Sequence, residues 1–151
     1  MPDLFFSRER VFKLSPLRGV YFLIFALCFA LTEAGREIYR PFVYRNGIED
    51  LGLADVVGNL LGTVVIIFLQ LGAAHATRKQ GLRIIALVTG GVVVYELLQP
   101  ILPRGVLDWK DVVSTVVAGG FALGLLLLVT HLIPDTPSGV EGVPLKSGRR
   151  R

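Results

Sequence analysis

The sequence predicts an all-α polytopic membrane protein, a four-helix bundle that crosses the bilayer four times. Apolar residues make up 52% of the 151 side chains, only 19% are charged, and the mean hydropathy is +0.61. This composition is too apolar for an ordinary soluble domain. Four segments approach or reach the roughly 20 apolar helical residues that a hydrocarbon core requires, namely 17–34, 55–76, 82–98 and 112–133. The alternation typical of β-barrel strands is not seen.

The basic residues predict the orientation of the chain, because Lys and Arg accumulate on the cytoplasmic side. With both termini in the cytoplasm, only five of the 16 Lys and Arg stay on the outer side: Arg36, Arg40, Arg45, Arg104 and Lys110. The net charge of +4 is therefore explained by topology, and nucleic-acid binding is not expected.

The chain divides into three parts. Residues 1–16 mix apolar and basic side chains, which predicts a cytoplasmic interfacial segment. Residues 17–133 form the four-helix transmembrane domain. Residues 134–151, rich in Pro, Gly and Ser, predict a disordered, basic cytoplasmic tail near the lipid headgroups. The single Cys28 excludes an intrachain disulfide and a thiolate metal cluster, and neither a metal nor a cofactor is expected.

The two halves of the chain resemble each other. The segment Glu-Ile-Tyr-Arg-Pro at 37–41 corresponds to Glu-Leu-Leu-Gln-Pro at 96–100, and each is followed by a polar loop and Asp-Val-Val, at 55–57 and 111–113. We interpret the chain as two helix hairpins of one design. Because a hairpin returns to its starting side, the halves are parallel repeats, and both acidic clusters face the outer surface.

The repeat also predicts the helix boundaries at that surface. Pro41 and Pro100 are expected to end the first helix of each hairpin, since proline cannot donate to the helical ladder. Asp55 and Asp111 are expected to be the N-caps of the second helices. The glycines of the second and fourth segments predict surfaces of close helix packing; they are Gly58, Gly62, Gly119, Gly120 and Gly124.

Charged and amide side chains near these boundaries predict an outward-facing polar basin over the bundle. Its candidate residues are Glu37, Arg40, Asp55, Asn59, Glu96, Gln99, Arg104, Asp108 and Asp111. Ionised groups so close to hydrocarbon are costly unless they are paired or hydrated. Arg40 and Arg104 are candidate contacts for a phosphate or carboxylate. The alternative, which stays open, is that these residues pair with one another and hold the helices together.

The second half of the chain resembles the VanZ-like family of small bacterial membrane proteins. The residues that carry the resemblance are Tyr-Glu-Leu-Leu-Gln at 95–99, Leu-Pro-Arg at 102–104 and Leu-Asp-Trp-Lys-Asp-Val at 107–112, with Asp-Val-Val-Gly-Asn-Leu-Leu at 55–61 in the first half. The resemblance implies a multi-pass protein of the bacterial cytoplasmic membrane. It also implies a link to glycopeptide antibiotic susceptibility, since the family is named for a member linked to teicoplanin resistance.

The leading functional hypothesis is that the basin binds a cell-envelope ligand, either a lipid-linked headgroup or a glycopeptide. A second hypothesis is an enzyme acting on a lipid phosphate or glycan, which would need turnover and a divalent cation; no nucleophile–base motif accompanies the carboxylates, so no catalytic residue is assigned. A third is a structural or assembly subunit. Membrane lipids are expected partners in each case, and homo- and hetero-oligomers both stay open.

Overall fold

The computed structural model describes residues 15–102 and 105–133. These residues form helices and connecting turns, and no strand occurs among them. In chain order the elements are α1 (Pro16–Ala34), a π-helical turn (Gly35–Tyr39), α2 (Arg40–Asn46), α3 (Leu53–Ala73), α4 (Arg78–Leu98), a 3-10 turn (Gln99–Ile101) and α5 (Trp109–Leu132). The interfacial segment predicted at 1–16, apart from its last two residues, and the tail predicted at 134–151 lie outside the described residues, as does Arg104.

Four helical segments in the described part of the chain are long and apolar enough to span a membrane: Pro16–Asn46, Leu53–Ala73, Arg78–Ile101 and Trp109–Leu132. The prediction of an all-α chain with four helices of membrane-spanning length is thereby confirmed. The first of these segments extends well beyond the predicted 17–34, because α1, the π-helical turn and α2 follow one another without a break.

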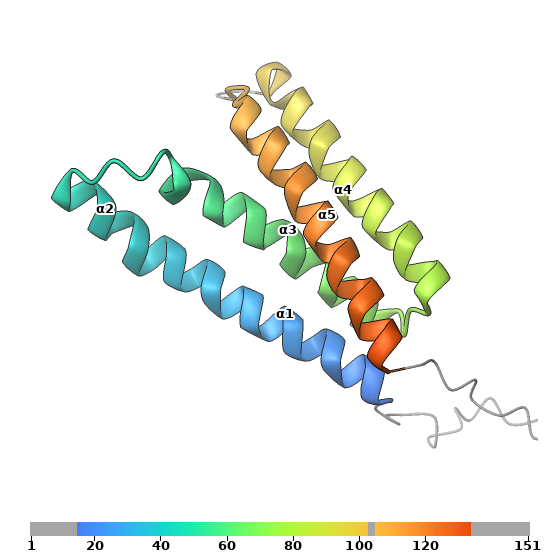
Figure 1. The fold of residues 1–151 in the computed structure, drawn as a ribbon. Helices are drawn as coiled ribbons and strands as arrows, with labels where there is room; N and C mark the ends of the chain where they lie inside the picture. The colour runs from blue at the N-terminus through green and yellow to red at the C-terminus, as the bar shows by residue number, and fades with distance from the viewer. Residues whose placement is uncertain (1–14, 103–104, 134–151) are drawn as a thin grey trace, which may run out of the picture.

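The helices pack in the order α1, α3, α5, α4, so that α3 and α5 are central and α1 and α4 lie on either side of them (Figure 1). Among the described residues α1 does not contact α4. The core lies along the α3–α5 contact, where Val64, Ile67 and Phe68 of α3 are fully buried, as are Ala118 and Ala122 of α5.

The prediction that Pro41 ends the first helix is wrong. In the π-helical turn before it, the N–H of Arg40 bonds to the carbonyl of Gly35, five residues earlier. Pro41 then occupies the first turn of α2, where proline is well tolerated. The helix ends at Gly47, whose φ of +58° is left-handed. The N–H of Ile48 donates to the carbonyl oxygen of Val43 at 3.1 Å, which completes a Schellman motif. Pro100 does stand where α4 ends, in the 3-10 turn after Leu98.

The N-cap predictions are also wrong, because another aspartate caps each helix. Asp108 caps α5 by accepting from the Lys110 N–H at 2.9 Å. At α3 the N-cap residue is Gly52, and the carboxylate of Asp50 accepts from the amides of Gly52 and Ala54. Asp55 and Asp111 are each the third residue of their helix, where the helix dipole still favours a negative charge.

One of the five predicted glycines, Gly119, marks close packing. At Gly119 a Cβ atom would lie 2.5 Å from Oγ1 of Thr89 in α4, so the missing side chain lets α4 and α5 approach each other. At Gly58, Gly62, Gly120 and Gly124 a Cβ atom would meet nothing within 4 Å. For these four the prediction of close packing within the described chain is wrong, since no atom of a neighbouring helix lies where a side chain would begin.

We predict opposite effects for alanine at the adjacent glycines of α5. Gly119→Ala forces a methyl group against Thr89, whose branched side chain is stiff in a helix, and should lower the free energy of unfolding by about 1–3 kcal/mol. Gly120→Ala, the matched control, should leave stability unchanged or raise it by up to about 1 kcal/mol. Thermal unfolding of both purified variants in detergent measures the difference; equal stabilities would contradict the close contact.

Candidate functional site

The predicted site residues that the structure describes lie at one end of the molecule, where α2, the start of α3, the end of α4 and the start of α5 are found (Figure 1). We call this region the polar end. The structure divides the predicted basin there into an exposed group on α2 and α3 and a more buried group on α3, α4 and α5.

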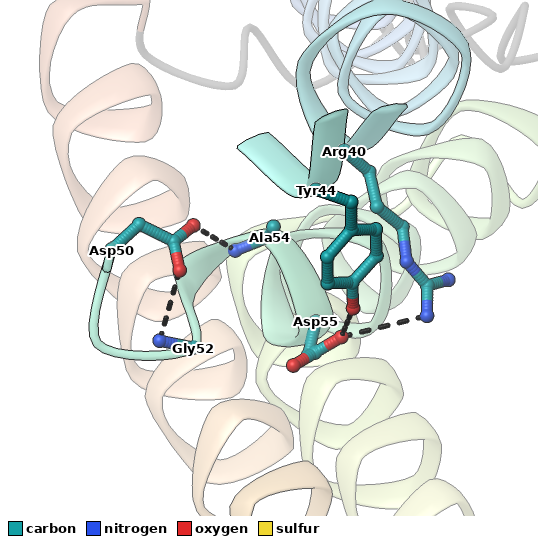
Figure 2. Close-up of polar contacts among 6 residues, drawn as sticks. All are labelled: Arg40, Tyr44, Asp50, Gly52, Ala54 and Asp55. Carbon is teal, nitrogen blue, oxygen red and sulfur yellow. Dashed lines mark hydrogen bonds and ion pairs between the residues drawn. The ribbon is translucent and has the colours of Figure 1, made fainter. Parts of the chain in front are cut away.

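The exposed group joins α2 to α3 through Asp55. Figure 2 shows the side chains of Arg40 and Tyr44 directed toward this carboxylate. Arg40 Nη2 lies 3.4 Å from Asp55 Oδ1, the Tyr44 hydroxyl donates to the same oxygen, and the guanidinium carbon lies 5.5 Å from the centre of the Tyr44 ring. Because both charged side chains are about half exposed, solvent screens the pair and its contribution to stability is small. Arg40 therefore has a partner within the chain.

Asp50 holds the loop between α2 and α3. Its carboxylate accepts from the Ala54 amide at 2.7 Å and from the Gly52 amide at 3.1 Å (Figure 2), and from the Tyr39 hydroxyl at 3.1 Å. Partial burial works against ionisation, but the hydrogen bonds from Ala54, Tyr39 and Gly52 outweigh it and hold the pKa of the Asp50 carboxyl below its ordinary value.

Glu37 is not brought together with the other site residues. Its side chain is 69% exposed and pairs with Arg36 at 3.4 Å on the π-helical turn. Glu96, its counterpart in the sequence repeat, is instead only 6% exposed. The two glutamates therefore occupy different environments: Glu37 is exposed on the π-helical turn, and Glu96 is buried near the end of α4.

Asn59 connects the two central helices. Its Nδ2 atom donates to the carbonyl oxygen of Asp111 at 2.9 Å and lies within hydrogen-bonding distance of the hydroxyls of Thr115, at 3.1 Å, and Ser114, at 3.2 Å. Ser114 and Thr115 are buried. The side-chain amide therefore connects α3 to α5 by hydrogen bonds, a role that polar side chains commonly have between membrane helices.

Glu96 is the most buried charged residue of the polar end. The amide of Gln99, one turn later, donates to its carboxylate. Asp111 of α5 lies close enough for the two carboxylates to repel each other, and Asp111 also interacts with Asp108 and Asp55. Three helices thus bring four acidic side chains together, and we call the set of Asp55, Glu96, Asp108 and Asp111 the acidic basin.

Sequence reasoning missed four residues that organise this region. The hydroxyl of Tyr44 donates to Asp55, and Asp50 caps α3. Ser114 and Thr115 bind Asn59. The signal for the last two was present, since hydroxyl side chains one turn after Asp111 in an apolar helix are typical of interhelical hydrogen bonding.

The basin offers carboxylate acceptors, which suit hydrogen-bond donors or a positive charge on a ligand. In the described part of the chain, no group of three or more His, Cys, Asp or Glu is arranged to hold a metal ion. Comparisons of the chain with family models, with curated proteins and with solved structures give no match.

We predict that Asp50 stabilises the fold in a pH-dependent way. Asp50→Ala removes three hydrogen bonds and should lower Tm by roughly 2–4 °C near neutral pH. Because the folded carboxyl has a lower pKa than the unfolded one, its stabilisation is present above about pH 4 and is lost as the pH falls further. The difference in Tm between wild type and variant should therefore shrink below about pH 4.

Thermal unfolding in detergent across this pH range measures the effect. Glu49→Ala, which removes the exposed neighbouring carboxylate, is the control and should leave Tm unchanged. A difference between wild type and Asp50→Ala that stays constant with pH would contradict the role of the ionised carboxylate.

We also predict that Asn59→Ala weakens the contact between α3 and α5. The change removes the donor that the buried Thr115 and Ser114 share and should lower the free energy of unfolding by about 1–2 kcal/mol. Asn46→Ala is the matched control, because the Asn46 side chain bonds only to the carbonyl of Phe42 within its own helix. Thermal unfolding compares the two, and the prediction fails if Asn46→Ala is the more damaging change.

Proposed function

We propose that this chain is a VanZ-like protein of the bacterial cytoplasmic membrane whose acidic basin binds a cell-envelope ligand, either a lipid-linked headgroup or a glycopeptide. One observation carries the proposal: Glu96 is a buried carboxylate at the end of an apolar helix and lies beside a second carboxylate, Asp111. Burying the Glu96 carboxylate close to a second negative charge and near hydrocarbon is unfavourable. A ligand that donates hydrogen bonds or brings positive charge would offset that cost.

The small number of positively charged partners for these carboxylates within the described chain supports a ligand at this place. Gln99 donates to Glu96, and Arg40 pairs with Asp55 on the exposed side. The described residues form no salt bridge with Glu96, Asp108 or Asp111. Glycans and peptides carry many hydroxyl and amide donors, and a glycopeptide can also carry an amine, so both ligand classes fit an acceptor-rich basin.

The proposed topology puts both termini in the cytoplasm and the polar end at the outer surface, with the chain built from two parallel-repeat hairpins. Its support is the excess of Lys and Arg in the inner segments. The packing of α1 on α3 and of α4 on α5 is compatible with two hairpins. The shared position of Asp55 and Asp111, each third in its helix, agrees with the repeat as well.

A structural or assembly subunit is the second candidate, and the Asn59 contacts favour it. The Nδ2 donor of Asn59 is directed to acceptors on α5, so this residue holds the two helices together. If Glu96 and Asp111 also serve to hold helices together, the polar end is a structural contact between helices and not a ligand site. The two candidates differ in whether Glu96 can be replaced without loss of folding.

We predict that Glu96→Gln abolishes ligand binding while the protein stays folded, because glutamine keeps the shape of the side chain and removes its charge. Teicoplanin and a lipid-linked disaccharide pentapeptide are the probes, each added to purified protein in detergent. At about 100 times its Kd, a ligand that binds only the folded state raises the free energy of unfolding by about 2.7 kcal/mol, or Tm by roughly 5–10 °C. This shift should occur in the wild type and be lost in Glu96→Gln and Asp111→Asn.

Glu37→Gln is the matched control, since Glu37 occupies the corresponding place in the repeat but is exposed, and it should keep the full shift. Variants that melt early while neither probe stabilises the wild type would favour the structural subunit. A full shift retained in Glu96→Gln would exclude Glu96 from the site.

A further inference from the structure

A second feature of the polar end is an apolar groove between α3 and α5. Its volume is about 300 Å³, and its walls are Val56 and Leu60 of α3 with Val113 and Val117 of α5. Leu51, Trp109, Lys110 and Ser114 complete the lining. Lys110 and Asp111 are consecutive residues of α5 and so point roughly 100° apart around the helix. The groove is therefore a neighbour of the acidic basin with a different chemical character.

Lys110 places a positive charge at this groove. It is the second residue of α5, its side chain is exposed, and its Nζ atom lies over the loop at Gly52, 3.2 Å from where a Cβ atom of that glycine would be. Within the described residues Lys110 forms no salt bridge, although Asp108 and Asp111 are near in sequence. Its ammonium group is therefore available to an anion that lies against the groove.

Large apolar side chains surround the same place without cover from the rest of the described chain. Leu51 is fully exposed and has a left-handed φ of +59°, a conformation that is unfavourable for leucine. Trp109 is 68% exposed at the first residue of α5. Exposed tryptophan and lysine at the end of a spanning helix are typical of the interface where lipid headgroups lie.

We propose that this groove binds one glycerophospholipid, with an acyl chain between α3 and α5 and the lipid phosphate at Lys110. Charge complementarity favours this occupant, since the groove combines apolar walls with an available cation at the depth of the headgroups. The phosphate would accept hydrogen bonds from the ammonium group, and Trp109 and Leu51 would contact the glycerol and upper acyl region.

The shape of the groove argues against a helix from a second copy as the occupant. The groove extends along α5 from Trp109 to Val117, a rise of eight residues or about 12 Å. Two spanning helices, in contrast, can contact each other along much of a ~30 Å hydrocarbon core. Helix contacts in membranes also favour small residues, and the walls here are valine and leucine.

The test is photo-crosslinking of the full chain in detergent. The probe is a phosphatidylglycerol that carries a diazirine in one acyl chain, and the crosslinked residues are mapped by mass spectrometry. A diacylglycerol with the same photoreactive chain has no phosphate and serves as the comparison. We expect crosslinks on the α3 and α5 walls from phosphatidylglycerol, and at least severalfold fewer from diacylglycerol.

Lys110→Gln should reduce these crosslinks about fivefold, the effect expected for one lysine at an anionic membrane surface. Lys79→Gln is the matched control, because Lys79 is the second residue of α4 at the opposite end of the molecule, and it should leave them unchanged. Val117→Phe, which fills the groove with an apolar side chain, should reduce the crosslinks even with Lys110 intact.

Three results would overturn the proposal: equal crosslinking in Lys110→Gln and wild type, equal crosslinking by diacylglycerol, or crosslinks that lie outside the groove. A dimer in which the walls are protected from the probe would assign the groove to a second copy. These outcomes are independent of teicoplanin and glycan binding at Glu96, so the groove and the basin are tested separately.

Discussion

The contact between α3 and α5 is the interaction on which the rest of the structure depends. α1 packs on α3 and α4 packs on α5, while α1 and α4 do not meet among the described residues. Inside a bilayer, apolar side chains gain little by leaving lipid for protein, so helix association rests on close packing and on hydrogen bonds between helices. The α3–α5 contact has both: the buried alanines Ala118 and Ala122 allow close approach, and Asn59 donates across to Thr115 and the Asp111 carbonyl.

This contact also determines the character of the polar end. By fixing the start of α5 against α3, it brings Asp111 toward Glu96 at the end of α4 and toward Asp55 at the start of α3. Asp55 lies in solvent with Arg40 and Tyr44, so its charge is screened and costs little. Glu96 is buried at a helix end next to hydrocarbon, where a carboxylate is expensive. That contrast makes Glu96, and not the exposed ion pair, the centre of the proposed ligand site.

Two consecutive residues of α5 then serve opposite chemical purposes. Asp111 adds a negative charge to the acidic basin, while Lys110 adds a positive charge to the apolar groove between α3 and α5. The helical rotation between neighbouring residues keeps the two charges on different sides. A hydrogen-bond-donating headgroup at the basin and a phospholipid at the groove would accordingly recognise separate surfaces of one helix end.

The sequence by itself determined the all-α class, the four helices of spanning length and the end of α4 near Pro100, because these depend on apolar length and local backbone chemistry. It also indicated that the polar side chains gather near the turns of the chain. One of them, the amide of Asn59, bonds to a neighbouring helix. Tertiary structure decided the rest. Pro41 does not end its helix because a π-helical turn precedes it, and the capping aspartates are Asp50 and Asp108. Glu37 and Glu96 look alike in sequence, yet one is exposed and the other buried. Burial depends on which helices pack beside a residue, and that is a property of the folded arrangement that local sequence does not encode.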